Sequence, residues 1–270
     1  MPRPNSGLRK LVIVFTVGLL LLVVLGVVTA GKGSEKGELK VASKITAKLS
    51  EEIAKAGAEE LPVIILLKKG DTPTEKIQLQ STVASTVEAK GGKVKYKYRL
   101  INAIAAKVPV SKITELARLD EVEKIFYDEV LFIPPTLQVR AETSLENATK
   151  SIGADYAWNL GYDGTGVTIA VIDTGINYTH PDLGGGFGAG YKVASGYDFV
   201  NNDDNPMDDN GHGTHVAGII AANGSIKGVA PNATLLAVKV LGADGGGYLS
   251  DVIAGVDWSV ANGADIISMS

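Results

Sequence analysis

Two residues of this chain are placed to do acid–base chemistry together. Asp173 follows an apolar run over residues 167–172 and precedes a Thr-Gly pair. Such a run predicts a central parallel strand, and open α/β sheets place their sites at the carboxyl ends of these strands. His212 opens a run of small and apolar residues, which predicts a buried helix with Asn210 as its N-cap. An Asp and a His delivered in this way can form the orienting pair of a nucleophilic triad.

The position of His212 suits a general base, because the positive end of a helix dipole favours the neutral imidazole that accepts a proton. Each of the two residues also has an alternative interpretation. An Asp that ends a strand often only forms a turn, and a His that opens a helix is often structural or solvated. The two segments together are more specific than either alone.

Both segments are similar to the motifs of one protein family. Residues 171–176, Val-Ile-Asp-Thr-Gly-Ile, resemble the aspartate motif of the subtilisin-like serine proteases, the subtilase family. Residues 212–218, His-Gly-Thr-His-Val-Ala-Gly, resemble the histidine motif of that family. The resemblance implies an α/β fold with a parallel-sheet catalytic domain over residues 141–270. It also implies a serine endopeptidase, with Asp173 and His212 as catalytic residues and a peptide or protein as substrate.

Composition excludes several other kinds of site. The 270 residues contain no cysteine, so disulfides, thiolate zinc sites and cysteine nucleophiles are absent. Residues 31–130 hold 18 Lys and Arg against 15 Asp and Glu, a net charge of +3. Residues 141–270 hold 4 against 15, a net charge of −11. An acidic half of this kind is not expected to bind nucleic acid, but it could hold cations or dock a less acidic segment.

The first 30 residues have the layout of a signal peptide. Arg3, Arg9 and Lys10 precede an apolar run over residues 11–28, and Val-Thr-Ala at residues 28–30 resembles a cleavage site. We therefore expect a secreted, extracellular protein without stable membrane association after signal removal. An uncleaved membrane anchor is the alternative, since the run is close to the lower limit for a spanning helix.

Residues 61–130 predict a small ferredoxin-like domain within a segment that spans residues 31–140. Strands are expected at 61–70, 93–98, 101–110 and 124–127, with helices at 74–90 and 110–124. The resulting order is β-α-β-β-α-β, the split βαβ arrangement. Its position before the subtilase motifs resembles the inhibitory propeptides of that family, which implies an intramolecular chaperone and inhibitor whose tail lies in the active-site cleft. An unrelated small domain is the alternative.

Elements outside the two motifs and this domain are less distinct. Residues 31–58 are mixed and charged with weak helical periodicity, and no function is assigned to them. Residues 131–149 are expected to form a linker with a processing site, and residues 152–158 a short helix.

An acidic segment predicts a calcium site. Residues 197–209 contain five aspartates, and clustered carboxylates and amides in a loop can supply the six to eight oxygen ligands that Ca²⁺ takes. The predicted ligands are Asp198, Asp203, Asp204, Asp208 and Asp209. A solvated acidic loop is the alternative. The family often builds calcium sites with a loop after the histidine helix, but the corresponding residues 223–228 are few and include a lysine.

The resemblance also implies a substrate-binding strand. Gly245, Gly246 and Gly247 follow an apolar strand, and glycines let an extended peptide backbone approach closely. A flexible loop is the alternative. Ser270 falls where the wall of the family's substrate pocket begins.

No serine from the linker onward stands in a Gly-Thr-Ser-Xaa-Ala context, so we expect the nucleophile beyond residue 270 and no activity in this chain alone. Two other functions stay open. One is a metal-dependent hydrolase that uses Asp173, His180, Asp182, His212 and His215. The other is a calcium-dependent binding protein without a nucleophile.

Overall fold

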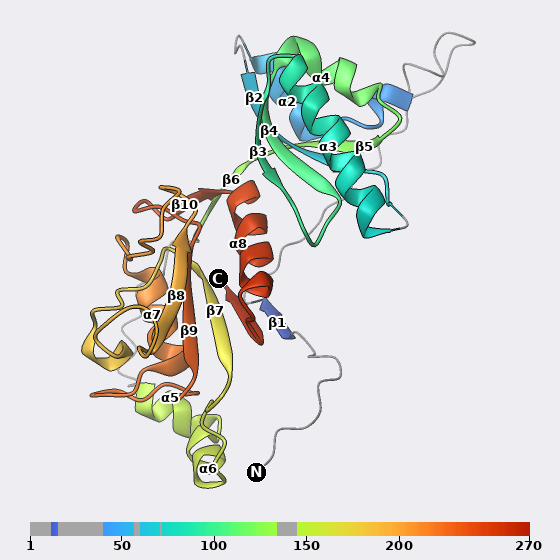
Figure 1. Ribbon diagram of the computed structural model, residues 1–270. Helices are drawn as coiled ribbons and strands as arrows, with labels where there is room; N and C mark the ends of the chain where they lie inside the picture. Colours follow the sequence, from blue (N-terminus) through green and yellow to red (C-terminus); the bar gives the residue numbers. More distant parts are fainter. Residues whose placement is uncertain (1–11, 16–39, 57–59, 71, 134–144) are drawn as a thin grey trace. The chain divides into compact units, whose positions relative to one another are not determined.

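The structure of the protein is a computed structural model that describes residues 12–15, 40–56, 60–70, 72–133 and 145–270. The chain divides into two compact units, each with its own sheet and its own buried core (Figure 1). The N-terminal unit is Leu20–Glu129, and the C-terminal unit is Val130–Ser270 together with Met1–Leu19. Within the described residues, no helix is long and apolar enough to cross a membrane.

The N-terminal unit has the predicted order of a ferredoxin-like domain. Alternate residues of its first strand, such as Val63 and Ile65, join Val83 and Leu116 from two helices in one buried cluster. Both helices therefore cover the same face of an antiparallel sheet, whose strand order is β3-β4-β2-β5. The elements are β2 (Glu60–Leu67), α3 (Pro73–Ala89), β3 (Lys93–Lys97), β4 (Ala103–Pro109), α4 (Val110–Ala117) and β5 (Val122–Tyr127).

Local side-chain contacts explain where two helices of this unit begin. In front of α3, Glu75 N donates to Thr72 Oγ1 at 3.2 Å and Thr72 N donates to Glu75 Oε2 at 3.1 Å, which is a capping box. A further helix, α2 (Ala47–Lys55), lies in the segment of weak helical periodicity. Thr46 caps it and its Leu49 is fully buried, so tertiary packing stabilises a helix that is too short to persist alone.

The C-terminal unit is built on a parallel sheet. Its central strand β7 (Thr168–Asp173) was predicted from the apolar run, and it pairs with β9 (Thr234–Lys239) and β11 (Ile266–Met269). The strand order is β1-β11-β7-β9-β8, and every pair of neighbours is parallel. The edge strand β8 (Val193–Asp198) was not predicted. The other edge strand, β1 (Val12–Phe15), is the part of the predicted signal peptide that lies within the described residues.

Helices cover both faces of this sheet (Figure 1). Side chains of a strand alternate between its two faces. Val171 and Leu235 share a buried cluster with Ala217 of α7 (His212–Ala221). Ile172 and Val238 point the other way, because a Cβ added to Gly255 of α8 (Leu249–Ala261) would lie within 3.5 Å of both side chains. The result is an α/β sandwich in which Asp173, two residues after Val171, projects toward α7.

Short elements complete the C-terminal unit and correct two predictions. Two elements enter the predicted linker over residues 131–149, β6 (Val130–Phe132) and α5 (Leu145–Ser151), while its residues 134–144 lie outside the described residues. The predicted helix over residues 152–158 is instead α6 (Ala154–Asn159), separated from α5 by Gly153, whose φ is 73°. The remaining elements are η1 (Pro181–Leu183) and β10 (Gly246–Tyr248).

Candidate active site

The structure brings Asp173 and His212 together. Asp173 is the last residue of β7, His212 is the first residue of α7, and the imidazole Nδ1 lies 2.8 Å from Asp173 Oδ1. The approach of α7 to the strand depends on Gly213, where an added Cβ would lie 2.1 Å from the carbonyl oxygen of Gly175. Only glycine fits there, so the Gly that follows the histidine is part of the geometry of the pair.

The carboxylate of Asp173 is buried and held on one side. Thr174 N donates to Oδ1 at 2.7 Å, while Oδ2 has no hydrogen-bond partner among the described residues. Burial raises the pKa of Asp173, and the hydrogen bonds from His212 and Thr174 offset part of that rise. Asp173 Oδ1 thus fixes Nδ1 of the imidazole as a donor and leaves Nε2 with the lone pair that accepts a proton.

The imidazole of His212 is accessible, with 19% of the side chain exposed. Within the part of the chain that the structure describes, Asp173 is its hydrogen-bond partner. The helix begins one residue later than predicted, because Gly211, at a φ of 104°, occupies the N-cap position. Asn210 still contributes to the helix start, since its Oδ1 accepts from His212 N at 3.2 Å.

The glycine strand near this pair binds an extended segment of the chain itself. β10 pairs antiparallel with β6, and Ile133 N donates to Gly245 O at 3.1 Å. The tail formed by residues 130–133 alternates, with Leu131 and Ile133 half-buried and the two residues beside Leu131 exposed. A Cβ added to Gly246 would lie 2.6 Å from the ring of Phe132, so the absence of a side chain at Gly246 gives the tail its room.

The residues predicted to bind substrate lie at two different strands of the unit. Gly246 and Gly247 are in β10, and Ser270 directly follows β11. Ser270 follows Met269, which pairs with Ile172, so Ser270 stands level with Asp173 at the carboxyl edge of the sheet. The role of these residues in binding substrate stays a prediction.

Comparisons with known proteins give this geometry a family. Residues 164–270 match the model of the subtilase family, and residues 62–133 match that of peptidase inhibitor I9. The chain belongs to the subtilase family. Both the predicted family and the predicted fold class are therefore confirmed.

Three curated relatives show how far the similarity of this subtilase extends. Minor extracellular protease Vpr of Bacillus subtilis (strain 168) is 43% identical over 199 residues, which are 67% of this chain and 24% of that protein. The thermophilic serine proteinase of Bacillus sp. (strain AK1) is 34% identical over 212 residues, 77% of this chain and 51% of that protein. Subtilisin E of Bacillus subtilis (strain 168) is 38% identical over 188 residues, 68% and 45%. The chain spans about half the length of these relatives or less.

The aspartates of the predicted calcium site in this subtilase do not converge. Asp198 ends β8, and its carboxylate accepts from the backbone of Val200 and Asn201 and from the Asn201 amide. Asp209 Oδ1 lies 2.6 Å from Nζ of the buried Lys239. In the described residues, no group of three or more His, Cys, Asp or Glu side chains could hold a metal ion. Asp198, Asp203, Asp204, Asp208 and Asp209 as arranged therefore do not fit one calcium site, and calcium binding stays a prediction.

Asp208 has a different role, which the sequence analysis missed. It accepts from Asn210 N at 3.0 Å, from Gly211 N and Thr214 N at 2.9 Å each, and from the hydroxyl of Thr214. Burial alone would raise the pKa of Asp208, but these hydrogen bonds outweigh it and lower the pKa below its ordinary value. Asp208 thus caps the first turn of α7. A carboxylate a few residues before a helix start is the available signal for such a cap.

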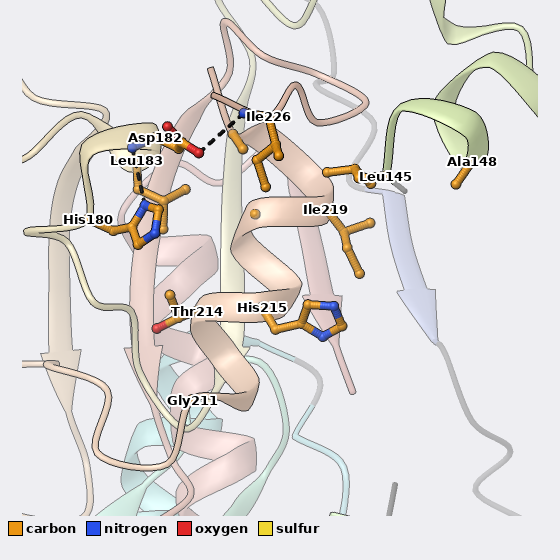
Figure 2. A pocket seen from close by; sticks show the side chains of 12 residues that line it. Leu145, Ala148, His180, Asp182, Leu183, Gly211, Thr214, His215, Ile219 and Ile226 are labelled. Carbon is orange, nitrogen blue, oxygen red and sulfur yellow. Dashed lines mark hydrogen bonds between the residues drawn. The ribbon is translucent and has the colours of Figure 1, made fainter. Parts of the chain in front are cut away.

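Residues of the alternative metal site also form hydrogen bonds with partners other than Asp173 and His212. His180 Nδ1 accepts from Asp182 N at 3.2 Å, and the buried Asp182 carboxylate accepts from Ser225 N and Ser225 Oγ at 2.7 and 2.6 Å. His180, Asp182 and His215 line a pocket of about 520 Å³ beside α7 (Figure 2), and neither Asp173 nor His212 is among the residues that line it. None of these contacts joins them to Asp173 or His212, so the metal-hydrolase alternative gains no support.

Proposed function

We propose that this subtilase is the secreted zymogen of a serine endopeptidase, which hydrolyses peptide bonds through an Asp-His-Ser triad. The hydrogen bond of 2.8 Å between His212 Nδ1 and Asp173 Oδ1, at the carboxyl edge of a parallel sheet, supports this function most directly. The serine would come from outside residues 1–270, because none from residue 141 onward stands in a nucleophile context.

The proposed reaction assigns each residue of the pair one task. His212 Nε2 accepts the hydroxyl proton of the serine while the serine oxygen attacks the carbonyl carbon of the substrate. Asp173 holds the ring and stabilises the imidazolium that forms. The imidazolium then donates the same proton to the leaving amine. A water molecule, deprotonated by His212 in its turn, hydrolyses the acyl-enzyme and restores the serine.

The tail at residues 130–133 would inhibit the zymogen. It occupies β10 through main-chain hydrogen bonding, as a bound peptide does when it adds a strand to a sheet edge. The match of residues 62–133 to a peptidase inhibitor supports the assignment of the N-terminal unit and this tail to one inhibitory propeptide. The predicted role of the propeptide as a folding chaperone belongs to the same proposal.

Secretion and calcium binding complete the proposal. N-terminal sequencing of exported protein would give Gly31 as the first residue of the precursor after signal removal, and a start at Met1 with membrane retention would favour an anchor. Calcium binding would require the aspartates of residues 198–209 to rearrange from the contacts described above; bound calcium would then raise the melting temperature over that in chelator, and replacing Asp203 and Asp204 with Asn would abolish the difference. An unchanged melting temperature on chelation would identify a solvated loop.

Covalent labelling tests the proposed function. We expect a serine-directed phosphonofluoridate to label and inactivate the full-length protein, because the activated serine attacks phosphorus as it attacks a carbonyl carbon. The 270-residue chain should show neither labelling nor peptidase activity. A 270-residue chain that hydrolyses peptides in the presence of added metal, free of contaminating protease, would overturn the serine mechanism and favour the metal hydrolase.

A further inference from the structure

Thr174, the residue after Asp173, is fully buried, and every polar atom that it carries is hydrogen-bonded. Its N–H donates to Asp173 Oδ1 at 2.7 Å, and its carbonyl oxygen accepts from Lys239 Nζ at 2.7 Å. Its hydroxyl donates to Asp208 Oδ1 at 2.8 Å and accepts from Gly213 N at 2.9 Å. One side chain therefore joins the end of β7 to the helix turn that carries His212.

Asp208 determines the direction of this hydroxyl. A carboxylate only accepts, so the Thr174 hydrogen must point at Asp208, and the oxygen lone pairs are then free for Gly213 N. Asp208 is itself held by the N–H groups of Asn210, Gly211 and Thr214. The hydroxyl thus stands between two groups of fixed position, and Gly213 is the immediate neighbour of His212.

Lys239 holds the same residue from the other side. Its side chain is 1% exposed, and its ammonium donates to the carbonyl oxygens of Thr174 and Leu241 and to Asp209 Oδ1. These three bonds use all three ammonium donors. Because the backbone and the hydroxyl of Thr174 are both held, the position of Asp173 relative to His212 depends on Thr174.

We propose that Thr174 is a positioning residue, whose hydroxyl fixes the separation between the Asp173 carboxylate and the His212 imidazole. The proposal rests on the proposed function, in which these two groups are the acid–base pair. It assigns the threonine hydroxyl a role that the side-chain methyl, which only fills space, does not share.

Three substitutions separate the hydroxyl from the methyl. Thr174→Ser keeps the hydroxyl, Thr174→Val keeps the volume, and Thr174→Ala keeps neither. In the full-length protein we expect Thr174→Val and Thr174→Ala to lower kcat about tenfold to a hundredfold, as small misplacements of catalytic groups do. KM should stay within about twofold, because Thr174 is buried and none of its hydrogen bonds described above reaches residues 245–247. Thr174→Ser should keep kcat within about threefold of the unsubstituted protein.

The opposite ranking would overturn the proposal. If Thr174→Val retains kcat while Thr174→Ser loses it, packing by the methyl group is what matters. Equal kcat values for all variants would likewise exclude a positioning role. Should Thr174→Val fail to fold, Thr174→Ser and Thr174→Ala still differ by the hydroxyl alone, and the comparison of their kcat values decides.

NMR spectroscopy of the 270-residue chain tests the positioning role without peptidase activity. The proton on His212 Nδ1 should give a far-downfield, slowly exchanging NMR signal in the unsubstituted chain and in Thr174→Ser, because Asp173 holds it. The signal should broaden or disappear in Thr174→Val and Thr174→Ala. A signal that persists in all variants would refute the positioning role. An inactive full-length protein that shows the expected NMR pattern would refute the proposed function while leaving the positioning of the pair intact.

Discussion

At the scale of single residues, His212 and His215 are a matched pair within one helix turn. Both are on α7, but only His212 is hydrogen-bonded to Asp173, whereas His215 is exposed beside the pocket of Figure 2. The difference between them separates a catalytic role from a general effect of removing a histidine from this helix.

We expect His212→Ala to lower kcat of the full-length protein by about 10⁴-fold or more, because the base acts in the chemical step. Its melting temperature should change little, since the imidazole is not part of the core. His215→Ala is the control and should leave kcat within about threefold. Steady-state kinetics and thermal unfolding of both variants provide the check. Equal losses for the two histidines would contradict the assignment and favour a shared metal site.

Residues differ in how well the sequence predicts their roles. Asp173 and His212 were predicted because each stands at the end of an element, where a short pattern determines its position. Asp208 was assigned to calcium, because five aspartates close together in sequence look alike until their donors are known. Its partner Thr174 is 34 residues away in the chain. The sequence does not indicate which of several similar carboxylates folds back onto a helix end.

At the scale of elements, the contact between α7 and β7 depends on one glycine. An added Cβ at Gly213 would lie 2.1 Å from Gly175 O and 3.2 Å from Asp173 Oδ1. The first oxygen belongs to the backbone, and the second accepts a hydrogen bond from Thr174 N. At Gly218 on the same helix, an added Cβ would meet nothing within 4 Å. These two positions therefore separate close packing from helix propensity.

We expect Gly213→Ala to destabilise the protein by about 1–3 kcal/mol, because the helix must move away from the strand. Gly218→Ala should instead stabilise it by about 0.5–1 kcal/mol through lower backbone entropy in the unfolded chain. Denaturant unfolding measures both free energies. If the two variants unfold at the same denaturant concentration, the close approach of α7 to β7 does not constrain this position.

A second feature at this scale is the loop over residues 223–228, which follows α7. The carboxylate of Asp182 holds this loop through hydrogen bonds. The hydroxyl and N–H of Ser225, followed by the N–H of Ile226, lower the pKa of Asp182. A lowered pKa in the folded state means that the folded protein stabilises the ionised form of the Asp182 carboxyl group. The resulting stability is fully present above the unfolded pKa, about 3.9 for an aspartate, and is lost as pH falls through the lower folded pKa.

We therefore expect Asp182→Asn to lower the melting temperature at pH 6, with a difference from the unsubstituted protein that shrinks below about pH 4. Asp204→Asn, at an exposed position, is the control; both variants are measured in chelator, so that bound calcium cannot contribute, and the control should show a small difference at every pH. Thermal unfolding between pH 2 and pH 7 gives the two curves. A difference for Asp182→Asn that is constant with pH would mean that its charge does not stabilise the loop.

Regular elements were predicted where their pattern is strong and missed where tertiary contacts decide. The strand before Asp173 is a continuous apolar run, and β7 follows it closely. β8 contains Ser195 and Gly196, residues that weaken a strand pattern, and its pairing with β9 alone establishes it. Residues 131 and 132 were assigned to the linker for the same reason, since β10, the partner of β6, is a glycine-rich segment far along the chain.

At the scale of the whole molecule, the chain contains both the strand that we predict to bind substrate and a segment that occupies it. Ile133 N donates to Gly245 O, and an added Cβ at Gly245 would lie 3.8 Å from Asn210 Nδ2, whose amide oxygen accepts from His212 N. The tail therefore ends close to the acid–base pair. A propeptide that binds in this way would compete with substrate for the same main-chain groups.

Proline at residue 133 tests this competition, because it removes the N–H that donates to Gly245 O and leaves that carbonyl oxygen without its partner. We expect the separated propeptide with Ile133→Pro to inhibit the mature enzyme about tenfold more weakly or worse, since the loss of about 1–3 kcal/mol corresponds to that factor. Ile133→Val keeps the N–H and trims one methyl group, so its inhibition constant should rise by about threefold at most. Competitive inhibition of peptide hydrolysis measures both constants. Equal inhibition by the two variants would mean that the tail does not act through the hydrogen bond to Gly245, and that the binding energy of the propeptide arises elsewhere.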